Sequence, residues 1–172
     1  VIEIDRGQQT KISSINFIGN NNVRSRRLRD VIASEEDKFW KVFSRNTNLS
    51  ENLISLDKRL LLNYYKSIGY YDIKITSNIA QINPSGNADL VYSIQEGNRY
   101  TINKISTNVD DVFDKKIFFP LNDSFKEFIG KYYSPFKIKK LLQEIDLLIE
   151  SNNLQFVEHN VQEIIENDSI KI

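Results

Sequence analysis

A long internal repeat is the feature of this sequence that most constrains its fold. One phrase occurs twice at an offset of 90 positions, and it aligns Ile4, Gly7, Ile12 and Ile15 with Ile94, Gly97, Ile102 and Ile105. Further along, the stretch from Asn48 to Ile75 resembles the stretch from Tyr132 to Val161 at an offset of 84. A repeat of this length is a small domain rather than one turn of a solenoid. The sequence therefore predicts tandem copies of one unit.

The first complete copy has the local patterns of a strand, two helices and two strands. Residues 11–19 alternate as a strand does, and residues 23–34 have near-helical apolar spacing. Ser50 is a good N-cap for a long helix that ends at Gly69. Residues 70–82 and 88–94 read as two strands around the turn "NPSGN", with Ile73, Ile75 and Ile79 on one face.

The second copy repeats this order. Residues 100–107 predict a strand, and residues 112–130 hold a short helix and a loop. Ser134 and Pro135 begin the long helix, as an N-cap followed by a proline at the first helical position. Residues 154–165 predict the next strand, and residues 167–172 predict a turn and the start of the last one.

Composition excludes several classes of protein. The formal net charge is zero, so a basic footprint for nucleic acid is not expected. Cysteine is absent, which excludes disulfides and thiolate metal sites. No apolar run reaches the length of a membrane-spanning helix. Methionine is also absent, even at position 1, and we therefore expect the chain to be a piece of a longer polypeptide.

The unit resembles the polypeptide-transport-associated (POTRA) domain. Its marks are "I..I.F.GN" at Ile12–Asn20, "YY...GYYD.KI" at Tyr64–Ile75 and "I.EG" at Ile94–Gly97. The tandem copies are similar to the third and fourth POTRA domains of outer-membrane protein assembly factors of the BamA family. The second copy departs from the pattern, because it has Asn153 in place of the glycine and "TNVDD" in place of "GNNN".

The resemblance implies an α+β fold, with units that each have a three-stranded mixed sheet covered by two antiparallel helices. It implies three parts: residues 1–7 as the last strand of a preceding unit, residues 8–97 as a complete domain, and residues 98–172 as a domain truncated in its last strand. It also implies a non-catalytic role in the periplasmic portion of a bacterial outer-membrane protein. The implied partners are unfolded outer-membrane β-barrel proteins, accessory lipoproteins and the parent's own membrane barrel, with no nucleic acid, small-molecule substrate, cofactor or metal.

A client strand is expected to add to an open sheet edge by main-chain hydrogen bonds, which make little demand on its sequence. In the family the last strand is central, so the preceding strand, Asp72 to Gln81, forms that edge. The predicted client-binding residues are Asp72, Ile73, Lys74, Ile75, Thr76, Ser77, Asn78 and Ile79. Their isoleucine side chains are also explained as sheet core, and this is compatible with binding through the backbone. The matching segment 155–163 carries Glu158 and Glu163 and is expected to pair less freely.

Three further features have a structural and a functional interpretation. Arg26 and Arg27 belong to an arginine cluster that is either a solvated helix face or a partner contact. Phe39 and Trp40 either close one end of the core or form a partner or interdomain patch. Gly97, Asn98 and Arg99 join the two copies, either as a passive joint or as an interdomain hinge.

No residues are predicted to be catalytic. His159 is the only histidine, so a catalytic triad would require this one residue as its base. Two alternatives to an assembly factor stay open. The first is the transport arm of a related secretion or translocation barrel. The second is a small enzyme, which would need a convergent polar pocket with perturbed pKa values.

Overall fold

The computed structural model describes residues 10–38, 46–155 and 157–172, and for residues 76–80 it describes the backbone only. Contacts divide the chain into two compact units, Val1–Tyr64 with Ile73–Glu96, and Tyr65–Asp72 with Gly97–Ile172. The predicted preceding strand at residues 1–7, and the predicted contacts Phe39 and Trp40, lie outside the described residues.

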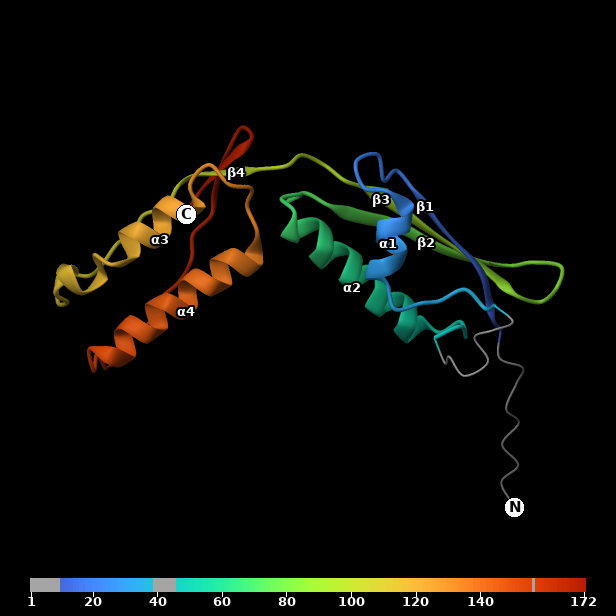
Figure 1. Cartoon of the computed structure of the whole chain (residues 1–172), viewed down its shortest axis with the longest axis horizontal. Coiled ribbons are helices and arrows are strands. Elements are labelled where there is room, and N and C mark those ends of the chain that lie inside the picture. The colour runs from blue at the N-terminus through green and yellow to red at the C-terminus, as the bar shows by residue number, and fades with distance from the viewer. Residues whose placement is uncertain (1–9, 39–45, 156) are drawn as a thin grey trace, which may run out of the picture. The chain divides into compact units, whose positions relative to one another are not determined.

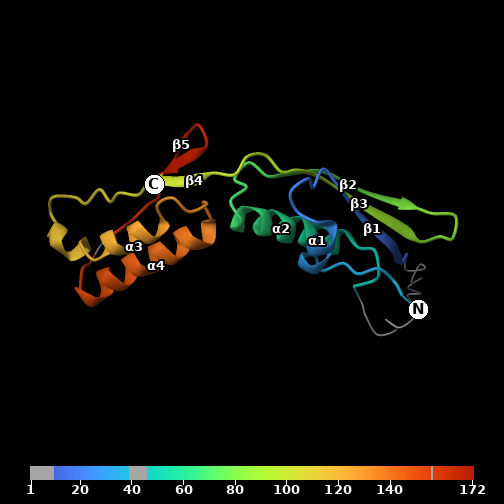
Figure 2. The same cartoon turned by 45° about the horizontal axis from the view of Figure 1, so that its top comes forward.

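The first unit contains the predicted order of strand, helix, helix, strand and strand. Its elements are β1 (Ile12–Ile18), α1 (Ser25–Val31), α2 (Glu51–Ser67), β2 (Lys74–Ile82) and β3 (Ala88–Gln95). The last strand, β3, is central, because it pairs in parallel with β1 and antiparallel with β2. Helices α1 and α2 cover the same face of this sheet (Figures 1 and 2). The predicted α+β fold is confirmed.

The core of this unit lies between the sheet and the helices. Alternate residues of β3 are buried, and Tyr92 and Leu90 are almost completely removed from solvent. Leu28 of α1 and Leu61 of α2 are also fully buried. Burying a large apolar side chain stabilises the fold by about 1.5–3 kcal/mol relative to leaving it exposed, so this layer holds the helices on the sheet.

A buried carboxylate connects α2 to the sheet. Asp57 is fully buried and accepts hydrogen bonds from the backbone N–H groups of Ala33 (2.7 Å) and Ser34 (3.0 Å). It also accepts one from the hydroxyl of Tyr92 (2.6 Å), and burial together with this hydrogen bond raises the pKa of Tyr92. Asp57 therefore joins α2, the segment after α1 and the central strand at one point.

Two residues of the sequence motifs, Gly19 and Glu96, have structural roles at the same end of the sheet. Gly19 has a φ of +82°, and a Cβ at this position would lie 2.1 Å from the carbonyl oxygen of Ile94. Glu96, which is buried, accepts hydrogen bonds from the backbone N–H (3.0 Å) and the side chain (2.7 Å) of Asn22. The glycine and the glutamate thus hold the turn after β1 against the end of β3.

The second unit has the same order of elements with shorter strands. Its elements are β4 (Thr101–Lys104), the 3-10 helix η1 (Lys115–Phe118), α3 (Leu121–Phe128), α4 (Pro135–Ser151), β5 (Ile164–Glu166) and β6 (Ser169–Lys171). The sheet order is β4-β6-β5, so the last strand is again central. Ser134 is the N-cap of α4 and Pro135 opens the helix, as predicted.

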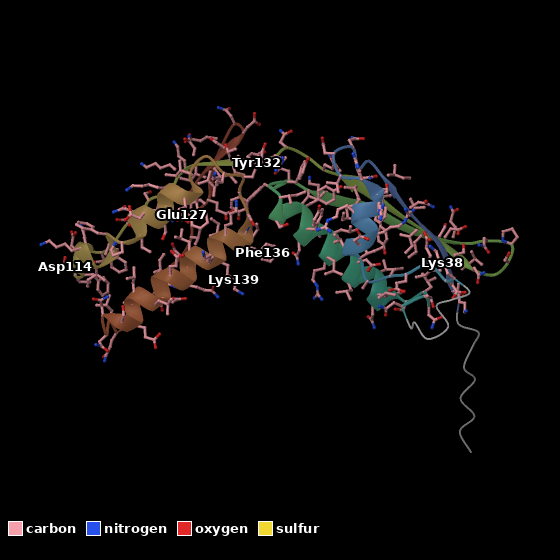
Figure 3. All side chains as sticks on the ribbon, viewed as in Figure 1. Lys38, Asp114, Glu127, Tyr132, Phe136 and Lys139 are labelled. Carbon is pink, nitrogen blue, oxygen red and sulfur yellow. The ribbon has the colours of Figure 1, made fainter. Side chains whose placement is uncertain are left out.

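Helix α4 is amphipathic. Ile138 and Leu141 are buried against the sheet and α3, whereas Phe136 and Lys139 are exposed on the other side of the helix (Figure 3). Phe125 and Phe128 of α3 complete the apolar cluster together with Ile170 of the central strand.

One predicted strand of the second unit is wrong over most of its length. Residues 154–165 were expected to be a strand, but β5 begins only at Ile164, and the described residues from 157 to 163 have no strand conformation. A strand needs a neighbour to pair with, and β6 provides partners only for Ile164–Glu166. The preceding segment makes side-chain contacts instead, including His159 Nε2 with Asp146 Oδ1 at 2.7 Å.

Replacing Asp57 is expected to destabilise the first unit strongly. The Asp57→Ala change leaves two backbone N–H groups and the Tyr92 hydroxyl without their acceptor, so we expect a loss of about 3 kcal/mol in the free energy of unfolding. Urea unfolding followed by circular dichroism measures this loss. Asp30→Ala, on the exposed surface of α1, is the control and is expected to change stability by less than about 0.5 kcal/mol.

Two glycines with similar backbone angles are expected to differ in their tolerance of alanine. Gly86 has a φ of +79° with open space around it, so Gly86→Ala is expected to cost about 1 kcal/mol from backbone strain alone. Gly19→Ala adds a steric clash with the Ile94 carbonyl, and we expect its cost to exceed that of Gly86→Ala by at least about 2 kcal/mol. Equal losses in parallel unfolding experiments would contradict the close contact at Gly19.

Candidate functional site: the open edge of the first sheet

Strand β2 is an edge strand. It pairs with β3 from Lys74 to Ile82, and within the part of the chain that the structure describes no strand pairs with its other side. An edge strand presents unpaired N–H and C=O groups to which an extended chain can bind. We call this side of β2 the open edge.

The register shows which peptide groups face outward. The N–H of Asn83 donates to the carbonyl of Asn87 (2.7 Å), so this pair is hydrogen-bonded. The N–H of Ala88 donates instead to Lys11 on the β1 side (2.7 Å), so its partner Ile82 faces away from β3. Hydrogen-bonded and non-bonded pairs alternate along an antiparallel ladder. The peptide groups of Asn78, Ala80 and Ile82 therefore face outward, and those of Ser77, Ile79 and Gln81 face β3.

A β-bulge between Ile75 and Ser77 interrupts this alternation. Ile75 pairs with Ile94, whereas Ile79 pairs with Val91, which is three residues away on β3. Paired residues lie on the same face of a sheet and successive residues of a strand on opposite faces, so the register places Ile75 and Ile79 on opposite faces. The expectation that Ile73, Ile75 and Ile79 share one face is therefore wrong. The extra residue at the bulge is the reason. The regular part of the open edge is consequently Ser77–Ile82.

The predicted client-binding segment and the observed strand overlap without coinciding. Lys74 to Ile79 lie in β2, while Asp72 and Ile73 precede it. Asp72 lies in a turn, where it accepts a hydrogen bond from the hydroxyl of Tyr100 (2.5 Å). Ala80 and Gln81, which complete the predicted edge strand, also lie in β2, and the strand extends one residue further to Ile82, whose side chain is 60% exposed.

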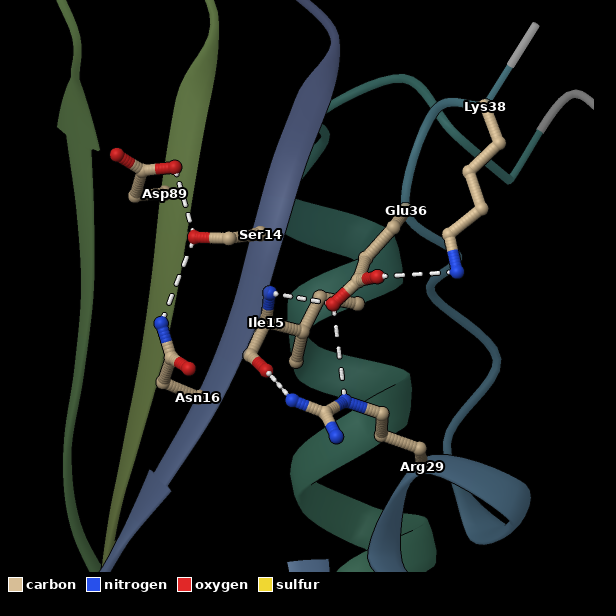
Figure 4. Close-up of polar contacts among 7 residues, drawn as sticks. All are labelled: Ser14, Ile15, Asn16, Arg29, Glu36, Lys38 and Asp89. Carbon is tan, nitrogen blue, oxygen red and sulfur yellow. Dashed lines mark hydrogen bonds and ion pairs between the residues drawn. The ribbon is translucent and has the colours of Figure 1, made fainter. Parts of the chain in front are cut away.

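The outer edge of β1 is closed, in contrast to that of β2. At Ile12, the N–H donates to the carbonyl of Thr47 and the carbonyl accepts from Asp37, both at 2.7 Å. At Ile15, the N–H donates to the carboxylate of Glu36 (3.2 Å) and the carbonyl accepts from the guanidinium of Arg29 (2.8 Å), as Figure 4 shows. Two side chains thus occupy the positions that a neighbouring strand would take. Sequence reasoning noted the arginine cluster but missed this role, because Glu36 is distant from Ile15 along the chain.

A polar network on the face opposite the helices joins β1, β3 and the hairpin turn. Asp89 accepts hydrogen bonds from the hydroxyls of Ser13 and Ser14, which lower the pKa of its carboxyl group. Asn83 donates to Ser13 (3.0 Å), and its own side-chain oxygen accepts from the N–H groups of Ser85 and Asn87. This network holds the hairpin at the end of the open edge.

The other predicted contact residues belong to segments other than β2. Arg26 is exposed on α1, and Arg27 packs on the ring of Tyr64 with its guanidinium 5.3 Å from the ring centroid. Of the predicted hinge, Gly97 has a φ of +68° and Asn98 is exposed. Arg99 stacks 3.3 Å from the ring centroid of Tyr132 and donates to the carbonyl of Ile68 (2.9 Å).

A cavity of about 700 Å³ lies in the second unit, and most of its lining is apolar. Phe113 and Ile138 contribute to its walls, and its polar lining includes Asp110, Glu158 and His159. No cluster of three metal-ligating side chains occurs among the described residues. Hydrogen bonds lower the pKa of the carboxyl groups of Asp89 and Asp123, and neither residue lines this cavity.

The fold defines a class of protein module. It consists of two consecutive strand-helix-helix-strand-strand units, and in each unit the last strand is central. A family model described as "POTRA: Surface antigen variable number repeat" matches residues 10–97, which is more than half of the chain. The chain therefore belongs to the POTRA family.

Individual relatives agree with this assignment. "Outer membrane protein assembly factor BamA" of Neisseria meningitidis serogroup B is 26% identical over 162 residues, which cover 94% of this chain and 20% of that protein. The protein of the same name from Neorickettsia risticii is 30% identical over 105 residues, which cover 61% of this chain and 14% of that protein. The chain thus spans a fifth or less of these curated relatives.

A solved structure shows the same fold. The crystal structure of POTRA3-5 of BamA from Haemophilus influenzae matches with a TM-score of 0.70 and 18% identity, over 98% of this chain and 66% of that chain. The predicted resemblance to BamA-type POTRA domains is confirmed. The predicted location, in the periplasmic portion of an outer-membrane protein, agrees with these relatives. Among the described residues, none of the helices meets the length and hydropathy of a membrane span.

Hydrogen exchange is expected to reveal the alternation along β2. The amides of Ser77, Ile79 and Gln81 face β3 and are expected to exchange at least about tenfold more slowly than those of Asn78, Ala80 and Ile82. Residue-resolved exchange measured by NMR provides the test. On β1, the amide of Ile12 is expected to be protected although it faces the outer edge, because it is bonded to Thr47. The reverse alternation on β2 would show a register shifted by one residue.

Proposed function

We propose that this segment binds unfolded outer-membrane β-barrel proteins in the periplasm by β-augmentation and guides them toward insertion into the outer membrane. The observation that carries the proposal is the open edge of β2, whose outward peptide groups at Asn78, Ala80 and Ile82 have the spacing of a strand. The chain's similarity to outer-membrane protein assembly factors supports the choice of client.

Main-chain pairing suits clients whose amino-acid sequences differ from one another. Barrel proteins share alternating strands but differ in side chains, and hydrogen bonds to N–H and C=O groups are independent of side-chain identity. The outward main-chain groups of Ile12 and Ile15 on β1 are already paired, so β2 is the edge of this sheet that needs no displacement before a strand binds. The polar network around Asp89 keeps the strand register rigid, so little ordering is required of the edge itself.

The proposed activity is binding and transfer without covalent chemistry. Accessory lipoproteins are proposed as further partners, with the exposed Arg26 and the neighbouring surface of α1 as their contact. The parent's membrane barrel is proposed as the acceptor of the client.

Proline substitutions at two adjacent exposed positions test the open edge. Gln81 and Ile82 both have exposed side chains, but only Ile82 has an outward-facing N–H. Ile82→Pro removes one edge donor without breaking the ladder to β3, and we expect about fivefold or greater weakening of client binding with unfolding changed by less than about 1 kcal/mol. Ala80→Pro, in the middle of the edge, is the second variant and is expected to weaken binding further.

Gln81→Pro is the matched control for the fold. It removes a hydrogen bond to β3 and is expected to destabilise the unit by about 3 kcal/mol. Binding is measured by amide NMR titration with a synthetic peptide that copies one transmembrane strand of an outer-membrane barrel protein. Shifts confined to α1 and α2, with Ser77–Ile82 unchanged, would refute binding at this edge.

A further inference from the structure

The outer edge of β1 is closed in two different ways along its length. At Ile12, both main-chain groups are paired with the backbone of other segments, namely with Thr47 and Asp37. At Ile15, both are paired with side chains, those of Glu36 and Arg29. Backbone partners are fixed by the fold, whereas long side chains can change rotamer without unfolding anything.

The two side chains at Ile15 reproduce the hydrogen bonds of a neighbouring strand. Glu36 provides an acceptor for the N–H at 3.2 Å, and Arg29 provides a donor for the carbonyl at 2.8 Å (Figure 4). They also approach each other, with Arg29 Nε 3.6 Å from Glu36 Oε1. Lys38 contacts the second carboxylate oxygen of Glu36 at 3.4 Å.

These side chains are accessible from solvent. The Arg29 side chain is 44% exposed and the Glu36 side chain is 23% exposed. An ion pair at such a position contributes little, because water screens it and can solvate both charges once they separate. The cost of displacing the pair from Ile15 is therefore small compared with the cost of opening a backbone ladder.

We propose that Ile15–Ile18 of β1 is a second strand-accepting edge, which the Arg29–Glu36 pair keeps closed until an extended polypeptide displaces it. The incoming strand takes over both hydrogen bonds of Ile15. It also pairs with the peptide group of Phe17. Inward-facing and outward-facing residues alternate along β1, and because Ser14 and Asn16 face β3, Ile15 and Phe17 face outward. Ile18, whose side chain is 58% exposed, gives the strand an apolar contact at the end of this edge.

The occupant is an extended client segment of the class proposed for β2, and in this respect the inference rests on the proposed function. Pairing at both edges of the sheet would give one domain two binding sites for the same unfolded chain. Two linked contacts raise the overall affinity without any new sequence requirement. The side-chain closure also keeps the main-chain groups of Ile15 paired while no strand occupies β1.

The test is an amide NMR titration of the whole chain with the same barrel-strand peptide. In the Arg29→Ala/Glu36→Ala variant we expect shifts of the Ile15–Ile18 amides, with binding there about tenfold tighter than in the unchanged chain. Lys38→Ala leaves both contacts to Ile15 intact and is expected to behave as the unchanged chain does. Glu36→Gln retains an acceptor for the Ile15 N–H and is expected to give an intermediate affinity.

The outcomes separate this inference from the proposed function. Shifts at Ser77–Ile82 report on β2, and shifts at Ile15–Ile18 report on β1, so each edge is scored independently in every variant. If the double variant stays folded and its Ile15–Ile18 amides do not respond, the second edge is refuted even where β2 binds. If the double variant unfolds, Glu36→Gln alone decides, and the absence of a gain over the unchanged chain refutes the proposal. Association of two copies through β1, seen as a concentration-dependent mass, would show a second copy as the occupant and would also overturn it.

Discussion

The central position of β3 is the constraint on which the rest of the first unit depends. Because the last strand of the unit lies between the two others, β1 and β2 both become edges. The hydrogen bond of Tyr92, on this central strand, to Asp57 of α2 then holds the helices to one face. The other face and the β2 edge stay accessible. Strand addition needs such an edge on a sheet that is already rigid, and this topology provides both.

The two edges of the sheet show two solutions to one physical problem. Unpaired peptide groups at an edge attract other chains, and proteins protect such groups unless binding is wanted. On β1 the protection comes partly from backbone segments and, at Ile15, from the side chains of Arg29 and Glu36. On β2 the described residues provide no comparable cover from Ser77 to Ile82. This asymmetry, rather than any chemical group, is the observation on which the proposed function rests.

The second unit shows that a segment with strand-like composition does not form a strand where it has no pairing partner. β6 pairs for three residues with each neighbour, and the segment before β5 remains without strand conformation although its composition favours one. Leu154 and Val161 pack instead against the apolar cluster around α4. Local propensity alone does not make a strand, because each strand is stabilised by the pairs that it forms.

The sequence by itself determined the repeat, the order of elements, the N-caps at Ser50 and Ser134, and the turns at Gly19 and Asn83–Asn87, because these follow from local patterns and turn chemistry. It also located β2 and its end at Ile82, although the predicted start at residue 70 lies four residues before Lys74. Only the tertiary structure decided the bulge after Ile75, because of which Ile75 and Ile79 pair with β3 on opposite faces of the sheet. It also decided that Arg29 and Glu36 pair with the main-chain groups of Ile15. Both depend on main-chain pairing between segments distant in sequence, and the periodicity of a single strand carries no information about its partner.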